Sequence, residues 1–314
     1  MHKNSFVPRE YAAEYLLDTF KTNYTKAKQN GITYSHQQTF LREHISGNLF
    51  QDTSGNYFEF SHLILCTGYC GLKGITANKK SIFSSLGRNP NYIDISFIKK
   101  GLPINRNDKV LIIGSKLSAV DCIILLENQN HQGPISMVST SGELPSVRNG
   151  MSIDYVPKYL SLNKFRGVFE VNRKRISLYL IKKYLILELR VLYKTEADLT
   201  KIFVTSTNPR ERLNEDISNC TRGVNKWEHI ISHLLDILTH YWNELPQVDR
   251  NIIITKYKKF ISRYISAMPL TNALVLKGLF DNKQLNLYKY RVTSSIQTDK
   301  GFMITVNGTI HQYD

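Results

Sequence analysis

The chain has 314 residues with 42% hydrophobic side chains, enough to bury a core over one large or two ordinary domains. Its formal net charge of +15 favours anionic partners such as nucleic acid. The longest apolar stretch, residues 176–193, is interrupted by charged side chains, whereas a membrane-spanning helix needs about twenty mostly apolar residues. Residues 1–9 contain no apolar run typical of a signal peptide, and the cysteines have no recognised zinc spacing. We therefore expect no transmembrane segment and a cytoplasmic protein with free thiols.

The N-terminal third is expected to hold one helix and a small sheet. Residues 10–29 have a helical pattern, and Pro8 suits the start of a helix. Residues 32–66 are strand-rich with Gly-containing turn signals, which predicts an antiparallel β-meander that leads to a strand at 63–66. Residues 68–106 carry many loop formers.

The most informative segment is 109–138. An apolar β-branched run at 110–113 predicts a buried strand, residues 117–126 predict a helix, and residues 134–138 predict a second strand. A strand, turn, helix and strand within about thirty residues is the length of a dinucleotide-binding unit. The turn of such a unit presents backbone N–H groups and the positive end of a helix dipole to a pyrophosphate.

The glycine pattern of this turn is incomplete. The dinucleotide-binding fingerprint is G-x-G-x-x-G/A. Gly114 and Ala119 suit its first and third positions, but Lys116 stands where the second glycine lets the backbone approach the phosphates. The lysine would either block the ligand or add a favourable charge, and a strand–helix–strand unit that binds no cofactor remains an equal alternative. The candidate cofactor-binding residues here are Gly114, Ser115, Lys116, Leu117, Ser118 and Ala119.

The C-terminal half is expected to be mostly helical over 155–279 and to close with β-segments at 285–297 and 301–311, paired as a hairpin. A basic stripe with Tyr179 in it follows the helix expected at 173–194. Such a stripe suits a phosphate backbone, but a solvated helix face is favoured. His229, His233 and Asp236 have metal-ligand spacing, yet they lie opposite the apolar stripe of their helix, which argues against a metal site.

These patterns predict an α/β protein: a Rossmann-like three-layer nucleotide-binding unit with a small β-meander and a mostly helical C-terminal region. The predicted divisions are a partial FAD-domain-like segment at 1–105, an NAD(P)-binding βαβ unit at 106–150, a helical region at 151–284 and a terminal β-hairpin at 285–314.

Several segments resemble a family of FAD/NAD(P)-binding flavoproteins, similar to flavin-dependent urate hydroxylases and aspartate N-monooxygenases. The segments at 6–16, 63–69, 131–145 and 241–250 resemble the family's F-x-P-R-x-x-Y-x-x-Y-L, ATG, GHxGPIxxVSRRGLLP and LWxxLPxxDR patterns, in the same order. The resemblance spans nearly the whole chain. It departs from the family at Ser139-Thr140-Ser141-Gly142, which stands where the family has SRRG.

The resemblance implies a flavin-dependent NAD(P)H oxidoreductase or monooxygenase that acts on a small-molecule substrate. NAD(P)H would contact the turn at 114–119 together with Ser139, Thr140 and Ser141, and FAD would contact Thr67, Gly68 and Arg9. The family's first FAD-binding unit and last flavin strand have no counterpart in the chain. We therefore expect a truncated form that holds FAD weakly or not at all by itself, or that requires a separately encoded FAD-domain fragment.

The alternative is a non-catalytic remnant of this family, or a binding protein that uses its basic surface for a nucleic-acid or other anionic partner. No catalytic side chain is identified, since the sequence contains no nucleophile elbow or P-loop pattern. This is neutral for a flavoprotein, in which the cofactor carries the redox chemistry.

Overall fold

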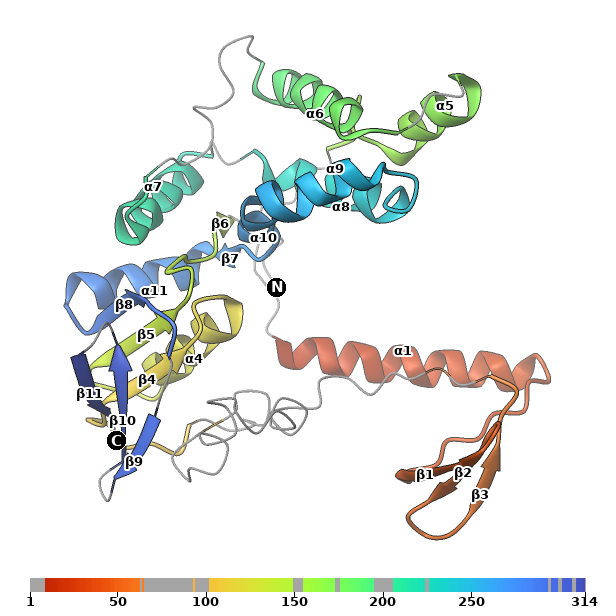
Figure 1. Cartoon of the computed structure of the whole chain (residues 1–314), viewed down its shortest axis with the longest axis horizontal. Helices are drawn as coiled ribbons and strands as arrows, with labels where there is room; N and C mark the ends of the chain where they lie inside the picture. The colour runs from red at the N-terminus through yellow and green to blue at the C-terminus, as the bar shows by residue number, and fades with distance from the viewer. Residues whose placement is uncertain are drawn as a thin grey trace. The chain divides into compact units, whose positions relative to one another are not determined.

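The computed structural model describes residues 9–62, 64, 93, 102–148, 155–172, 176–194, 206–223, 226–292, 295–298, 301–306 and 309–313. The chain forms two compact units, one over Ser5–Cys70 and one over Gly71–Asp314. Figure 1 shows the helices and strands of both units. The predicted four-part division at residues 105, 150 and 284 stays a prediction.

The first unit contains one long helix and the predicted meander, whose strands pair in the order β1-β2-β3, all antiparallel. Asp52 holds the turn after β2 because its carboxylate accepts hydrogen bonds from Thr39 Oγ1 (2.8 Å) and from the backbone N–H groups of Ser54 (2.9 Å) and Asn56 (2.8 Å). The elements are α1 (Arg9–Gln29), β1 (Leu41–Ser46), β2 (Leu49–Asp52) and β3 (Tyr57–Glu59). The strand expected at 63–66 lies outside the described residues apart from Ile64.

The second unit is built around a parallel sheet in the order β4-β5-β8. Helix α4 joins β4 to β5, which confirms the strand, turn, helix and strand expected at 109–138. Helix α11 precedes β8 in the chain. The elements are β4 (Val110–Ile113), α4 (Leu117–Asn128), β5 (Ile135–Ser139), α11 (Leu270–Asp281) and β8 (Leu285–Lys289).

The two faces of the parallel sheet are covered by different layers, because alternate residues of a strand point to opposite faces. On one face Ile112, Met137 and Leu285 join a core with α4, α11 and α7 (Pro209–Thr221). On the other face Leu111, Val138 and Tyr288 pack against the C-terminal β-segments. The mixed helix and strand composition agrees with the predicted α/β class, while one covering layer is made of strands.

The C-terminal strands differ from the expected hairpin. The segment expected at 285–297 is divided: its first part is β8 of the parallel sheet, and only its last part pairs with β10. Leu285 and Leu287 face the helical layer and Tyr288 faces the other, so this strand is apolar on both faces and is stabilised inside the sheet. The antiparallel sheet is β9 (Ser295–Thr298), β10 (Gly301–Val306) and β11 (Thr309–Tyr313).

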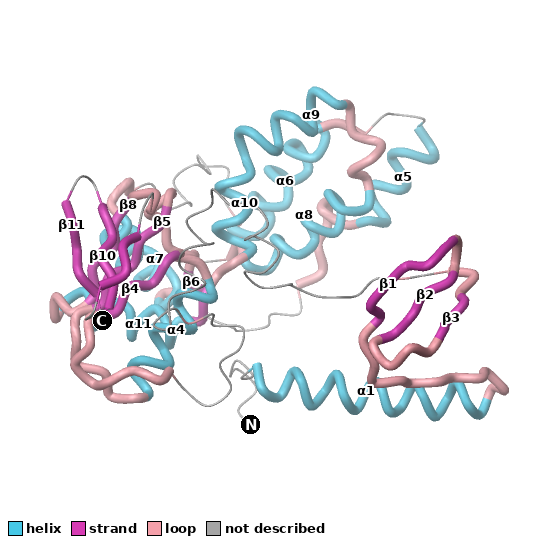
Figure 2. Tube along the Cα trace, turned by 60° about the horizontal axis from the view of Figure 1, so that its bottom comes forward, coloured by secondary structure: helices cyan, strands magenta, loops and turns pink. Residues whose placement is uncertain are grey.

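A separate helical cluster has its own core, as predicted for the region after residue 155. Figure 2 shows its helices together. Its core includes Leu160, Phe165, Ile176, Ile181, Leu189 and Ile237. The elements are α5 (Leu162–Asn172), α6 (Leu178–Tyr193), α8 (Glu228–His240), α9 (Gln247–Ile252), a π-helical turn at Ile253–Tyr257 and α10 (Lys258–Ile265).

The chain passes between the parallel sheet and the helical cluster at a pair of short strands. Strand β6 (Val147–Arg148) lies parallel to β7 (Met268–Pro269). The Met268 N–H donates to the Ser146 carbonyl at 2.8 Å. Within the described ranges, no helix is long and apolar enough to cross a membrane.

Candidate functional site

The candidate site lies at the carboxyl end of β4, where the chain turns into α4. Gly114 has φ +128°, a conformation that side chains with a Cβ rarely adopt, and its N–H continues the ladder to the Val138 carbonyl at 2.8 Å. Lys116 is extended and precedes the helix, and no side chain caps the first turn of α4. Ala119 is buried against the sheet, as expected for the third position of the fingerprint. The turn therefore has a positive-φ glycine between a parallel strand and an uncapped helix, as expected for the first position of the fingerprint.

The turn after β5 lies directly against this first turn. Ser115 is 2% exposed, and its hydroxyl donates to the Glu143 carbonyl at 2.8 Å while its oxygen is hydrogen-bonded to Ser139 Oγ at 2.7 Å. Ser139 Oγ also accepts from the Gly142 N–H, and Ser141 Oγ accepts from the Glu143 N–H. The structure thus brings the residues predicted at 114–119 together with Ser139 and Ser141.

Lys116 is half-buried beside these turns. Burial lowers the pKa of its ammonium group, the carboxylate of Glu143 opposes that shift, and the guanidinium groups of Arg263 and Arg212 add to it. The three electrostatic causes come from charged groups on other segments of the chain. The side chain at the second position of the fingerprint is therefore part of a charged cluster.

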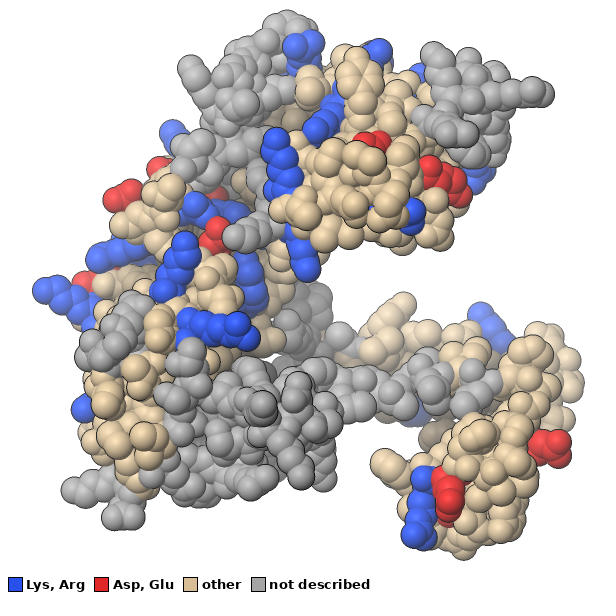
Figure 3. Space-filling view, viewed as in Figure 1, with Lys and Arg blue, Asp and Glu red and all other residues tan. Residues whose placement is uncertain are grey.

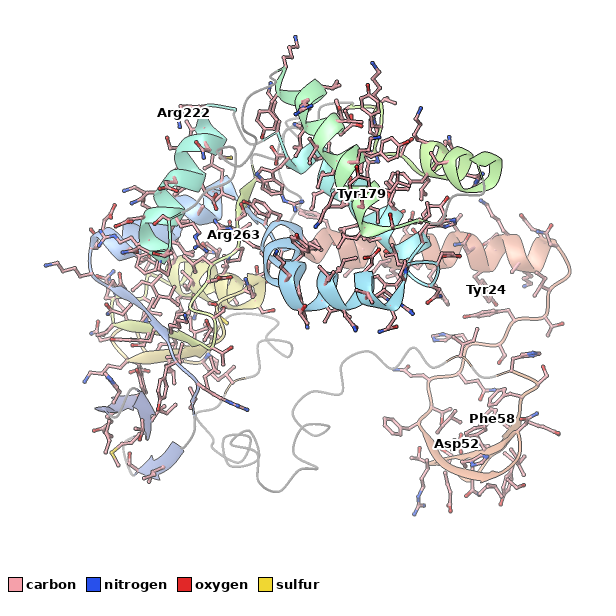
Figure 4. The ribbon with its side chains drawn as sticks, turned by 45° about the horizontal axis from the view of Figure 1, so that its top comes forward. Tyr24, Asp52, Phe58, Tyr179, Arg222 and Arg263 are labelled. Carbon is pink, nitrogen blue, oxygen red and sulfur yellow. The ribbon has the colours of Figure 1, made fainter. Side chains whose placement is uncertain are left out.

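Two arginines of this cluster were not predicted from the sequence. Arg212, on the first turn of α7, lies with Nη1 3.8 Å from Glu143 Oε1 and donates from Nε to the Ser206 carbonyl at 2.6 Å. Arg263, on α10, pairs with Asp216 of α7 at 2.5 Å, and Figure 4 labels it between these helices. No local pattern could have identified them, because they follow Lys116 by roughly a hundred residues or more and are placed by tertiary packing.

A small cavity of about 10 Å³ lies within the cluster, close to the room that one water molecule needs. Arg263 is 6% exposed, and its Nε has no hydrogen-bond partner among the described residues. The lining residues are Glu143, Leu144, Pro145, Pro209, Arg212, Leu213, Asp216 and Arg263. A buried N–H without a partner is costly, so this cavity suits a polar occupant.

Comparison of the chain with protein-family models, with curated proteins and with solved structures gave no match. The resemblance to FAD/NAD(P)-binding flavoproteins therefore stays a prediction, and the assignment of the turn depends on its geometry.

The other predicted contact residues are placed less fully. Thr140 is exposed beside the site. Thr67 and Gly68, expected at the flavin, lie outside the described residues, and Arg9 begins α1 with a side chain that is not described. Arg148, the arginine nearest in sequence to the turn after β5, points elsewhere: its Nη2 donates to the Ile265 carbonyl at 3.3 Å.

His229 and His233 of α8 are half-buried, and Asp236 is exposed. No group of three His, Cys, Asp or Glu able to hold an ion occurs in the part of the chain that the structure describes. The buried residues of this helix are Ile230, Leu234, Ile237 and Leu238, in line with the predicted apolar stripe. Burial lowers the pKa of His229, and Lys226 lowers it further.

The described cysteines are poor nucleophiles. Burial raises the pKa of the Cys122 thiol to about 11 and that of Cys220 to about 12, with nearby carboxylates adding to both shifts. The thiolate is the reactive form, so both side chains act as small apolar groups. Cys66 and Cys70 lie outside the described residues.

Proposed function

We propose that the turn between β4 and α4 binds the pyrophosphate of a nicotinamide dinucleotide in a Rossmann-like unit. The observation that carries the proposal is Gly114 at φ +128°, at the carboxyl end of a parallel strand and directly before a helix without a side-chain cap. Open α/β sheets bind ligands outside the carboxyl ends of their strands. The free N–H groups and dipole of a helix N-terminus favour a pyrophosphate there.

The wider proposal is a flavin-dependent NAD(P)H oxidoreductase that acts on a small molecule. It is supported by the ordered resemblance to FAD/NAD(P)-binding flavoproteins. In this proposal the residues at 114–119 hold and orient the nicotinamide cofactor, and the flavin supplies the redox chemistry when it is bound. Ser139 and Ser141 keep the turn after β5 in place beside the cofactor through their hydrogen bonds.

Ser118→Asp tests the dinucleotide site, because its effects on stability and on binding have opposite signs. Ser118 is exposed in the first turn of α4. A carboxylate there stabilises the helix by about 0.3–1 kcal/mol through the macrodipole, but it repels a pyrophosphate. We expect calorimetric titration with NADH and NADPH to show at least ~10-fold weaker binding, together with an unchanged or higher melting temperature.

Asn128→Asp is the matched control, because it adds the same charge at the opposite end of α4. It should leave the affinity for the cofactor unchanged and slightly lower the stability. Equal affinities in the wild type, Ser118→Asp and Asn128→Asp would place the ligand elsewhere. No detectable heat from the wild type at millimolar cofactor would reject the proposal.

Flavin binding is tested by the visible absorbance of the purified protein. We expect the protein incubated with FAD to show flavin absorbance and to oxidise NAD(P)H, because the proposal requires a flavin. No retained flavin and no NAD(P)H oxidation after incubation with FAD would contradict the flavoprotein proposal.

A second candidate is binding of a single-stranded nucleic acid on α6. Tyr179 is 76% exposed there and shares a face with Lys183 and Arg190, four and eleven residues further along the helix. An exposed aromatic ring beside basic side chains can stack a base while the charges contact phosphates. Tyr179→Ala should weaken oligonucleotide binding in an anisotropy titration. An unchanged affinity would reject this candidate.

A further inference from the structure

The carboxylate of Glu143 lies among three cationic side chains in front of the dinucleotide-binding turn. Its backbone carbonyl accepts from the Ser115 hydroxyl, so the residue is held against the turn. Its Oε1 lies 3.8 Å from Arg212 Nη1, and its charge opposes the lowering of the Lys116 pKa. Arg263 lines the same cavity. Figure 3 shows lysine and arginine side chains gathered on one face of the second unit.

The two carboxylates of this cluster, Asp216 and Glu143, are not equally closely paired with arginine side chains. The carboxylate of Asp216 is paired with Arg263 through a bond between side chains that are 2% and 8% exposed. Glu143 lies at the longer distance of 3.8 Å from Arg212, and its side chain is 29% exposed while that of Arg212 is 18% exposed. A partly exposed ion pair at 3.8 Å contributes little, about 0–1 kcal/mol. Another anion can therefore replace the Glu143 carboxylate at small cost.

The available room also indicates what Glu143 excludes. The cavity beside its side chain has a volume of about 10 Å³, so a phosphate group fits only if the carboxylate moves out. Arg263 lines the same cavity, and its buried Nε has no hydrogen-bond partner among the described residues. Lys116 and Arg212 supply the charges that a phosphate requires, and a guanidinium is suited to phosphate geometry.

We propose that Glu143 is the resident anion of a phosphate subsite formed by Lys116 and Arg212, and that it sets the protein's selectivity between phosphate-bearing and phosphate-free ligands. The chemical class is a phosphate monoester. The identity of the ligand rests on the proposed function: the monoester of NADPH is its 2′-phosphate, which NADH lacks. Inorganic phosphate carries the same chemistry without the nucleotide.

The experiment titrates inorganic phosphate, NADH and NADPH separately into the wild type, Glu143→Gln, Arg212→Gln and the double variant. Removing the carboxylate should tighten phosphate binding by about tenfold, since a nearby like charge no longer opposes it. The ratio of NADPH affinity to NADH affinity should rise by a similar factor. Arg212→Gln should cancel both gains in the double variant.

Two substitutions on α7 provide matched controls. Glu215→Gln removes an exposed carboxylate, and Arg222→Gln removes a guanidinium at the far end of the helix (Figure 4). Neither should change the affinity for phosphate by more than about twofold, because exposed distant charges are screened. If Glu143→Gln unfolds, Glu143→Ser serves as the second variant, since it removes the charge and opens the same space.

The outcomes separate this inference from the proposed function. Tighter phosphate binding by Glu143→Gln without binding of either nucleotide would support the subsite and reject the dinucleotide site. Nucleotide binding whose NADPH preference is the same in the wild type and Glu143→Gln would support the dinucleotide site and overturn the subsite. An equal gain in Glu215→Gln would also overturn it, because the effect would then reflect net charge.

Discussion

At the residue scale, Glu188 is the side chain on which the helical cluster most clearly depends. It lies on α6, is completely buried, and accepts from the backbone N–H groups of Lys158 (3.0 Å), Tyr159 (2.5 Å) and Leu160 (2.7 Å) and from the Tyr155 hydroxyl. Burial alone would raise the pKa of this carboxyl, but the hydrogen bonds from Tyr155 and the three N–H groups together lower it. One carboxylate thus accepts hydrogen bonds from three backbone N–H groups of the turn that leads into α5.

Glu188→Ala should lower the free energy of unfolding by about 3 kcal/mol, because it leaves several buried donors without an acceptor. Urea unfolding followed by circular dichroism measures the loss. Glu244→Gln, at an exposed position after α8, is the control and should change stability by less than about 0.5 kcal/mol. A loss of similar size in both variants would contradict the role of Glu188.

Acid should remove the same stabilisation. The folded-state pKa of Glu188 lies below the ordinary value of 4.5, so its contribution is present above that value and is lost as pH falls through the folded-state pKa. The difference in stability between the wild type and Glu188→Ala should therefore shrink in acid. A difference that grows as pH falls would contradict the direction of the shift.

At the element scale, the turn after β5 shows why the site needs a glycine that is not in the fingerprint itself. Gly142 has φ +62°, and a Cβ at this position would lie 2.7 Å from Lys289 Cβ at the end of β8. Strain and close packing therefore act together at the point where the turn meets the neighbouring strand. The turn holds Ser139, Ser141 and Glu143 in front of α4.

Gly142→Ala should destabilise the protein by about 1–3 kcal/mol, because an L side chain is strained at this φ and contacts Lys289. It should also weaken cofactor binding, since the turn must shift. Gly167→Ala is the control: Gly167 lies within α5 with nothing near an added Cβ, and alanine should stabilise that helix by up to about 1 kcal/mol. Thermal unfolding should show a lower melting temperature for Gly142→Ala and an unchanged or higher one for Gly167→Ala. A higher melting temperature for Gly142→Ala would contradict the turn geometry.

At the scale of the second unit, the buried pair between Asp216 and Arg263 links α7 of the sheet core to α10 of the helical region. The Ser146 N–H donates to the Arg263 carbonyl at 3.2 Å, so the same residue also contacts the segment before β6. Burial raises the pKa of Asp216, and Arg263 opposes that shift by charge and hydrogen bonding. Removal of the guanidinium would leave a buried carboxylate without its counterion.

Arg263→Met should cost about 3–5 kcal/mol at neutral pH, whereas the double variant Arg263→Met with Asp216→Leu should recover part of this loss, because no charge is then buried alone. Urea unfolding of the wild type, both single variants and the double variant measures the coupling. The loss in Arg263→Met should be smaller near pH 4 than near pH 7, because Asp216 can then take up a proton. Additive losses at both pH values would contradict the coupling.

Local features of the sequence by themselves determined the first strand, turn and helix of the candidate site. The apolar run at 110–113, Gly114 and the helical pattern from Leu117 are contiguous, so propensity and side-chain period are sufficient to predict them. The meander in the first unit was predictable for the same reason, since its strands follow one another with turn residues between them.

Only the tertiary structure decided which distant residues join the turn. Strand β8 enters the parallel sheet from more than a hundred residues beyond β5, and the charges of Arg212 on α7 and Arg263 on α10 act on Lys116. Parallel pairing and long-range ion contacts leave no periodic signal in the chain, because their partners are selected by the packing of whole elements. The glycine turn was therefore visible in the sequence, while the charges that surround it depend on how the elements pack.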